Sequence, residues 1–95
     1  MSNTKKYMGA VASTDCVICR EFDGVRTPGQ VHHIAEGSAT RSDYLTVCLC
    51  PLHHVGAVGV HGMGVKKFCN LFHLNNEYHL LELQAKYMTM DGIIK

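Results

Sequence analysis

The fold of this chain is decided by the stretch Cys48–Gly64, which reads CLCPLHHVGAVGVHGMG. Its 17 residues include two cysteines, three histidines, four glycines and one proline, with no carboxylate, Lys or Arg. Thiolates and imidazoles are the side chains that hold zinc and similar ions in proteins. Glycine and proline allow the backbone to turn tightly around such an ion. The stretch therefore predicts a turn that binds metal.

A second cysteine pair supplies the ligands that this turn lacks. Cys16-x-x-Cys19 and Cys50-x-x-His53 have the same internal spacing, and 30 residues separate them. Either pair alone is as consistent with small buried side chains, but together they form a three-cysteine, one-histidine tetrahedral set. We predict that these four residues bind a structural zinc ion. Cys48 is the rival for Cys50, and we assign it to the core because it falls on a predicted strand.

Length and composition limit the classes of protein that remain. A chain of 95 residues is one small domain whose apolar core is marginal without a metal. We expect residues 1–12 to form an N-terminal arm and residues 13–95 to form the domain. The N-terminus lacks the apolar segment of a signal peptide, no membrane-length apolar run occurs, and five cysteines cannot all pair. These features predict a cytoplasmic protein with reduced thiols and no membrane partner.

The remaining elements are predicted from hydrophobic period and turn residues. Val31–Ile34 and Leu45–Leu49 are expected to form two paired strands, and Asp23-Gly24 is expected to form a hairpin turn. Apolar residues from position 65 to 72 recur with the helical period. A second helix is expected after an Asn75 or Asn76 cap, with Glu77 in its first turn and an end at Asp91-Gly92. Its predicted apolar face consists of Tyr78, Leu81, Ala85 and Met88. The fold class is therefore small α+β.

Six histidines remain once the zinc ligands are assigned, and four of them lie near the predicted strand and zinc turn: His32, His33, His54 and His61. Neighbouring side chains on a strand point to opposite faces, so His32 and His33 can serve two different purposes. His73 and His79 lie among helical residues without a nearby ligand partner, and we treat both as surface or packing histidines.

With these motifs in place, the chain resembles the HNH endonucleases, whose fold is a zinc-stabilised ββα-metal (His-Me finger) domain, here with an additional C-terminal helix. It is most similar to the phage recombination-enhancement (Ref-like, RecA-dependent) nuclease family. The similarity covers roughly residues 16–85 and rests on the joint occurrence of four motifs. These are Cys16-x-x-Cys19, Val31-His32-His33-Ile34, Cys50-Pro51-Leu52-His53-His54 and Val60-His61-Gly62-Met63-Gly64-x-x-x-Phe68.

The resemblance implies a role for each of these histidines. His32 takes the place of the first ligand to a catalytic divalent metal, which is Mg²⁺, Mn²⁺ or Zn²⁺, and His33 takes the place of the general base. His54 stands where a second metal ligand is found, and His61 is a third ligand or a phosphate contact. The insertion Val55–Gly64 leaves open whether His54 and His61 exchange these roles. Asp43 stands where the family has the asparagine that orients the base.

The implied substrate is DNA in the cytoplasm of a bacterial host, with a phage or prophage origin and a role in recombination. The net charge is only +1, so local cations have to bind the phosphates. We predict Arg41, Lys66 and Lys67 for this role, with Arg20 and Arg26 as further candidates. Because so few cations give modest affinity, a recombinase filament is a candidate partner for presenting the DNA.

Two other classes of function remain open at this point. A non-catalytic zinc module that docks on protein or nucleic acid needs the zinc set but does not need His32, His33 and His61. A metal-dependent hydrolase of another substrate, or a degenerate HNH domain whose Asp43 marks lost activity, uses the same residues. Metal-dependent nicking of DNA distinguishes these classes.

Overall fold

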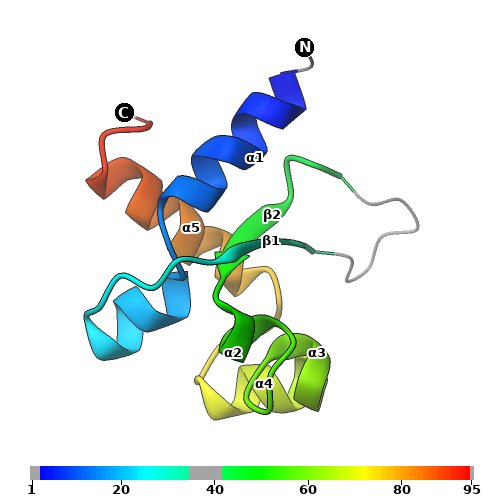
Figure 1. Cartoon of the computed structure of the whole chain (residues 1–95). Coiled ribbons are helices and arrows are strands. Elements are labelled where there is room, and N and C mark those ends of the chain that lie inside the picture. The colour runs from blue at the N-terminus through cyan, green and yellow to red at the C-terminus, as the bar shows by residue number, and fades with distance from the viewer. Residues whose placement is uncertain (1–2, 35–41, 95) are drawn as a thin grey trace.

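A computed structural model describes residues 3–34 and 42–94 of the chain. It is a small α+β structure in which short helices surround a two-stranded sheet (Figure 1). The elements in chain order are helix α1 (Asn3–Ser13), a π-helical turn η1 (Cys19–Asp23), strands β1 (Gln30–His33) and β2 (Thr46–Leu49), and helices α2 (Pro51–His54), α3 (Val60–Met63), α4 (Val65–Leu71) and α5 (His79–Met90). None of the described helices is long and apolar enough to span a bilayer.

The strand pair predicted from the sequence is present. β1 and β2 are antiparallel, with His32 opposite Val47 and His33 opposite Thr46. Because side chains alternate along a strand, His32 shares one face of β1 with Gln30, and His33 points to the other face. His32 is buried and His33 is partly buried. The hairpin therefore separates the two neighbouring histidines, as expected from the sequence.

Helices α1 and α5 pack against β2 and bury all four of its residues. Residues expected to form an N-terminal arm are helical from Asn3, and Val11 of α1 packs against Cys48 and Met88. The amide of Cys48 donates to the side-chain oxygen of Gln84 at 2.8 Å, and the Gln84 amide donates to Thr14 at 2.9 Å. A buried glutamine thus satisfies a polar group of the strand that the hairpin leaves unpaired.

The structure corrects two sequence predictions about chain turns. Asp23-Gly24 does not form a hairpin, because Gly24 has a left-handed φ of 67° and closes η1 by donating its amide to the carbonyl of Cys19. Helix α5 begins at His79 with Tyr78 as its N-cap, and no side chain caps it. Asn75 and Asn76 therefore do not act as the predicted cap, and Glu77 precedes the helix.

The predicted face of α5 is wrong for Tyr78 and Ala85 and right for Met88, and the predicted end at Asp91-Gly92 is confirmed. The buried residues follow an i, i+3, i+4, i+7, i+8 pattern, and they are Leu80, Leu83, Gln84, Tyr87 and Met88. Tyr78 and Ala85 are exposed. The apolar pattern was misread because Gln84, a polar residue, occupies the centre of the buried face. The face predicted for α4 is confirmed, with Phe68 and Cys69 buried.

Candidate metal centres

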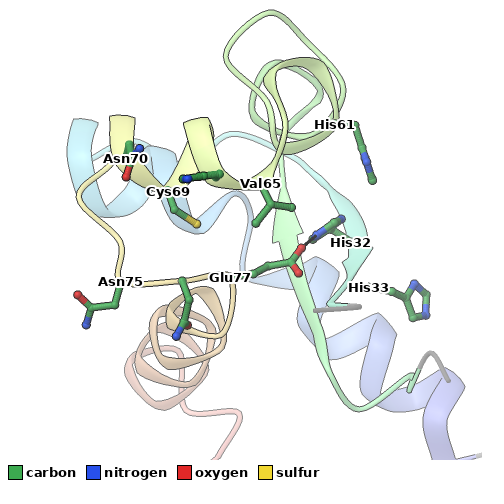
Figure 2. A pocket seen from close by; sticks show the side chains of 10 residues that line it. His32, His33, His61, Val65, Cys69, Asn70, Asn75 and Glu77 are labelled. Atoms are coloured by element: carbon green, nitrogen blue, oxygen red, sulfur yellow. Dashed lines mark hydrogen bonds and ion pairs between the residues drawn. The ribbon is translucent and has the colours of Figure 1, made fainter. Parts of the chain in front are cut away.

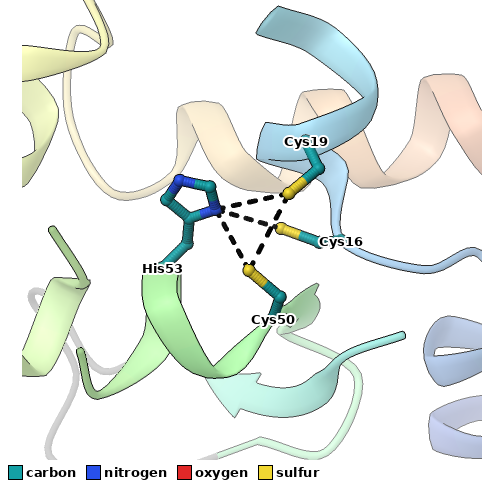
Figure 3. A group of neighbouring side chains, drawn as sticks. All are labelled: Cys16, Cys19, Cys50 and His53. Carbon is teal, nitrogen blue, oxygen red and sulfur yellow. Dashed lines mark hydrogen bonds between the residues drawn. The ribbon is translucent and has the colours of Figure 1, made fainter. Parts of the chain in front are cut away.

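The four predicted zinc ligands meet at one point beneath the hairpin (Figure 3). Cys16 precedes the helical turn that leads into η1, and Cys19 is the first residue of η1. Cys50 follows β2 directly, and Pro51 begins α2, which carries His53 three positions after Cys50. Proline suits this first helical position because its fixed φ is already helical and no amide is lost there. All four side chains are buried.

The distances among these ligands fit a central zinc ion. A tetrahedral zinc with ligands at about 2.3 Å (sulfur) and 2.0–2.1 Å (nitrogen) separates two sulfurs by about 3.8 Å and a sulfur from the nitrogen by about 3.6 Å. The Sγ atoms of Cys19 and Cys50 are 3.8 Å apart, and those of Cys16 and Cys19 are each 3.6 Å from Nδ1 of His53. The Cys50 sulfur is somewhat closer to this nitrogen, at 3.2 Å. This buried group can hold a zinc ion.

Burial disfavours an isolated charge on any of these ligands. It raises the pKa of the Cys16 thiol to about 12 and raises the pKa of Cys19 as well. Burial also lowers the pKa of His53, which favours the neutral imidazole that binds metal. Thiolates at this depth need a cation beside them, and a zinc ion bound by the group would supply one. None of the chain's five cysteines forms a disulfide, which agrees with a ligand role for these three.

Cys48, the rival ligand, lies elsewhere. Its sulfur is 3.7 Å from the carbonyl oxygen of Ala12, and the side chain belongs to the apolar cluster of Val11 and Met88. Its assignment to the core is confirmed. Cys69 is likewise buried in the core on α4 and is not part of the ligand group.

Three histidines form a second group that can hold a metal ion. His32 of β1, His54 of α2 and His61 of α3 each offer one nitrogen, and these atoms lie within 4.8 Å of one another. Their ring centroids are 4.8–5.2 Å apart. His32 is buried, His54 is partly buried and His61 is exposed, so the group opens to solvent on the His61 side. Both His54 and His61 join His32, and the structure gives no reason to choose between them.

The surroundings of His54 favour an unprotonated nitrogen facing the group. Burial lowers its pKa, and the neighbouring His32 and His61 lower it further. Its Nδ1 is 2.8 Å from the side-chain oxygen of Gln30. With Nδ1–H donated to this oxygen, the lone pair of Nε2 remains available. Gln30 reaches His54 because it lies on the same face of β1 as His32.

His33 has a separate partner. Its Nε2 lies 2.8 Å from Oδ1 of Asp43, the residue that the resemblance places at the base-orienting position. The Asp43 backbone is held by Thr46, whose hydroxyl donates to the Asp43 carbonyl at 3.1 Å. The loop before β2 therefore delivers a carboxylate to the histidine on the outer face of β1. This pairing leaves Nδ1 of His33 on the opposite side of the ring.

The sequence analysis missed Glu77. Its Oε2 is 2.7 Å from Nε2 of His32, and the Glu77 and His32 side chains are each only 4% exposed. Glu77 lies in the connection between α4 and α5, 45 positions from His32. In the sequence it reads as an acid in the first turn of a helix, so no local pattern distinguishes it. A carboxylate buried at this depth needs a specific partner, and His32 is one.

A cavity of about 630 Å³ adjoins the histidines (Figure 2). His32, His33 and His61 line it on one side. The rest of its wall comes from α4 and the α4–α5 connection, through Val65, Lys66, Cys69, Asn70, Asn75, Asn76 and Glu77. Three asparagines and a lysine give this wall hydrogen-bonding capacity, and Val65 and Cys69 add apolar surface. The cavity is therefore suited to a substrate with both polar and apolar parts.

The residues predicted to contact phosphate lie in different surroundings. Lys66 is exposed and lines the cavity, whereas Lys67 is exposed but does not line it. Arg41 lies outside the described residues. Arg20 and Arg26 both donate to Asp91, at 2.8 Å and 3.2 Å, so each already has a carboxylate partner. Arg20 also lies over the Tyr87 ring, 4.3 Å from its centroid, which places it on the α5 side of η1.

The two centres differ in what they can do chemically. The first is closed by four buried side chains, as in structural zinc sites, whereas the second offers three imidazoles and has an exposed edge that leaves room for a further ligand. Comparison with protein-family models, with curated proteins and with solved structures found no match for this chain.

Proposed function

We propose that the protein is a metal-dependent DNA endonuclease of the HNH type, with a zinc-stabilised ββα-metal domain built from β1, β2 and α2. The observation that carries the proposal is that the neighbouring residues His32 and His33 have different partners. One histidine joins two others in a group able to bind metal, and its neighbour is paired with a carboxylate on the opposite face of the strand. A purely structural zinc module needs neither arrangement.

The histidine group fits a catalytic divalent ion. Three imidazoles are neutral ligands, so they leave the full charge of the ion in place, and the exposed side of the group leaves room for substrate oxygens. An ion bound there supplies electrostatic stabilisation of the negative charge that develops on the phosphate and on the leaving oxygen. The protein's part is to hold His32 on β1, His54 on α2 and His61 on α3, and α2 also carries His53 of the first group.

His33 is the proposed general base. Its Nε2–H donates to Asp43, which fixes the ring, and Nδ1 is the nitrogen that we propose accepts a proton from water. Imidazole suits this task because its ordinary pKa lies near neutral pH. His33 lines the same cavity as His32 and His61, so a phosphodiester placed against the histidine group lies beside the base.

DNA reaches this centre through the same cavity. Lys66 lines the cavity and is the proposed phosphate contact, and Lys67 and Arg41 are proposed to add contacts outside it. With a net charge of only +1, the protein has little long-range attraction for DNA. We therefore keep a recombinase filament that presents the strand as the proposed partner, and recombination as the proposed setting.

Nicking of supercoiled plasmid tests the proposal. Zinc-loaded protein is incubated with Mg²⁺, Mn²⁺ or added Zn²⁺, and with EDTA as the metal-free condition. We expect relaxed circles with at least one divalent ion and none with EDTA. His61→Asn should abolish nicking, while His73→Asn, the same substitution at another exposed histidine, should not. DNA binding without cleavage under every condition would instead indicate a non-catalytic zinc module.

A further inference from the structure

We infer that Glu77 is the positioning residue of the histidine metal site, holding His32 in the tautomer and orientation that bind the ion. The inference rests on the second metal of the proposed function. Metal-binding histidines commonly donate their other ring nitrogen to a carboxylate, which fixes the ring and strengthens the nitrogen as a ligand. Glu77 and His32 have this geometry, with Nε2 and Oε2 2.7 Å apart.

The two nitrogens of His32 point in different directions. Nε2 faces Glu77, so Nδ1 is the nitrogen left for the metal group. In Figure 2 the imidazoles of His32 and His61 point toward each other, on the side of His32 away from Glu77. A proton on Nε2, donated to the carboxylate, leaves the lone pair of Nδ1 directed at the group formed with His54 and His61.

Glu77 is not placed as a ligand itself. Among the described residues, the atoms that gather within 4.8 Å belong to His32, His54 and His61, and Glu77 is not one of this group. Its backbone is anchored at the start of α5, where the Leu80 amide donates to the Glu77 carbonyl at 3.1 Å. Glu77 thus acts through His32. The connection between α4 and α5, where Glu77 lies, contributes no residue to the metal group.

The alternative is that Glu77 and His32 form a buried pair that only stabilises the fold. Glu77→Gln separates the two roles, because glutamine has nearly the same shape and can still accept the hydrogen bond, but it lacks the charge that strengthens the ligand. Glu82→Gln is the matched control, since Glu82 is an exposed carboxylate on α5. The zinc-loaded proteins are titrated with Mn²⁺ by calorimetry, and zinc content and thermal melts are recorded on the same samples.

We expect Glu77→Gln to bind Mn²⁺ roughly 10–100-fold more weakly than the wild type, with its zinc retained, and Glu82→Gln to match the wild type. Equal Mn²⁺ affinity in Glu77→Gln and wild type, or no second ion bound by the wild type, overturns the inference. If Glu77→Gln does not fold, ¹⁵N NMR of the wild type decides. A proton on Nε2 of His32 supports the inference, and a proton on Nδ1 alone overturns it.

These results are independent of cleavage. A wild type that binds Mn²⁺ with help from Glu77 but never nicks DNA keeps this inference and ends the proposed nuclease function. If the wild type nicks DNA and Glu77→Gln binds Mn²⁺ as tightly as the wild type, the proposed nuclease function stands and this inference is overturned.

Discussion

His33 and Asp43 form a hydrogen-bonded pair at the end of the hairpin where β1 connects to β2, with Nε2 and Oδ1 2.8 Å apart. The His33 side chain is 18% exposed and that of Asp43 is 42% exposed, so the pair lies at the surface where a substrate can reach it. A hydrogen-bonded pair at the surface adds little to stability. Its value in our account is orientation of the base.

Asp43 should therefore matter for rate through its oxygen rather than its charge. We expect Asp43→Asn, which can still accept from Nε2–H, to nick plasmid within roughly threefold of the wild-type rate, whereas Asp43→Ala should be slower by roughly 10–100-fold, part of the base's own contribution. Initial nicking rates at saturating metal measure the difference. An Asp43→Ala protein as fast as the wild type would show that the pair does not orient a base.

The zinc group should be required for folding. Because four buried ligands converge on one point, zinc binding contributes several kcal/mol or more to the free energy of unfolding. Cys16→Ser or Cys50→Ser should give an unfolded or insoluble protein, while Cys69→Ser, at a buried cysteine outside the group, should cost no more than roughly 1–2 kcal/mol. Native mass spectrometry and circular dichroism check both points. A metal-free protein with a cooperative thermal transition would disprove the requirement.

Lys66 and Lys67 provide a matched pair for the DNA contact. Both are exposed on α4, but only Lys66 lines the cavity beside the histidines. Lys66→Ala should weaken DNA binding and reduce the slope of log affinity against log salt by roughly one, the value for one lost phosphate contact. Lys67→Ala should have a smaller effect on both. Fluorescence anisotropy over a salt series, without divalent metal, measures this. A larger effect at Lys67 would place the DNA outside the cavity.

Asp91 should make stability depend on pH in acid. Arg20, which donates two hydrogen bonds to it at 2.8 and 3.0 Å, lowers the pKa of this carboxyl, and Arg26 adds to the effect. A folded-state pKa below the unfolded value of about 3.9 means that the pair stabilises the protein fully above that value. The contribution is lost as the pH falls through the folded-state pKa.

Asp91→Asn should therefore lower the free energy of unfolding by about 1–3 kcal/mol at pH 7. The gap between variant and wild type should narrow below about pH 4. Denaturant titrations of both proteins at each pH measure this gap. Zinc loss in acid affects both proteins, so it cancels in the difference between them. Asp23→Asn, at an exposed carboxylate, is the control. A gap that stays constant into acid would mean that the ion pair is not its source.

Local patterns were sufficient to predict the strands and the zinc group. Cys16-x-x-Cys19 and Cys50-x-x-His53 carry their chemistry in their spacing, and a short strand separates His32 from His33 whatever surrounds it. These features depend on neighbours along the chain, and the structure has the strand pair and the convergence of the four ligands as predicted.

Contacts between distant segments could not be predicted in this way. Glu77 reaches His32 from 45 positions away, and Asp91 reaches Arg20 from 71 positions away. Both acids read as ordinary helix-end residues, because the sequence does not show how α5 is rotated against the sheet. That rotation depends on buried Gln84, whose polar side chain conceals the true packing face.

The central claim is that His33 activates water for phosphodiester hydrolysis beside the histidine metal group. The most direct measurement is the nicking rate of His33→Ala against wild type, on samples matched for zinc content, Mn²⁺ affinity and thermal stability. Our account predicts that all three matched properties are unchanged, while the rate falls roughly 10²–10⁴-fold, the usual contribution of a general base. A stable His33→Ala protein that nicks plasmid close to the wild-type rate would contradict it.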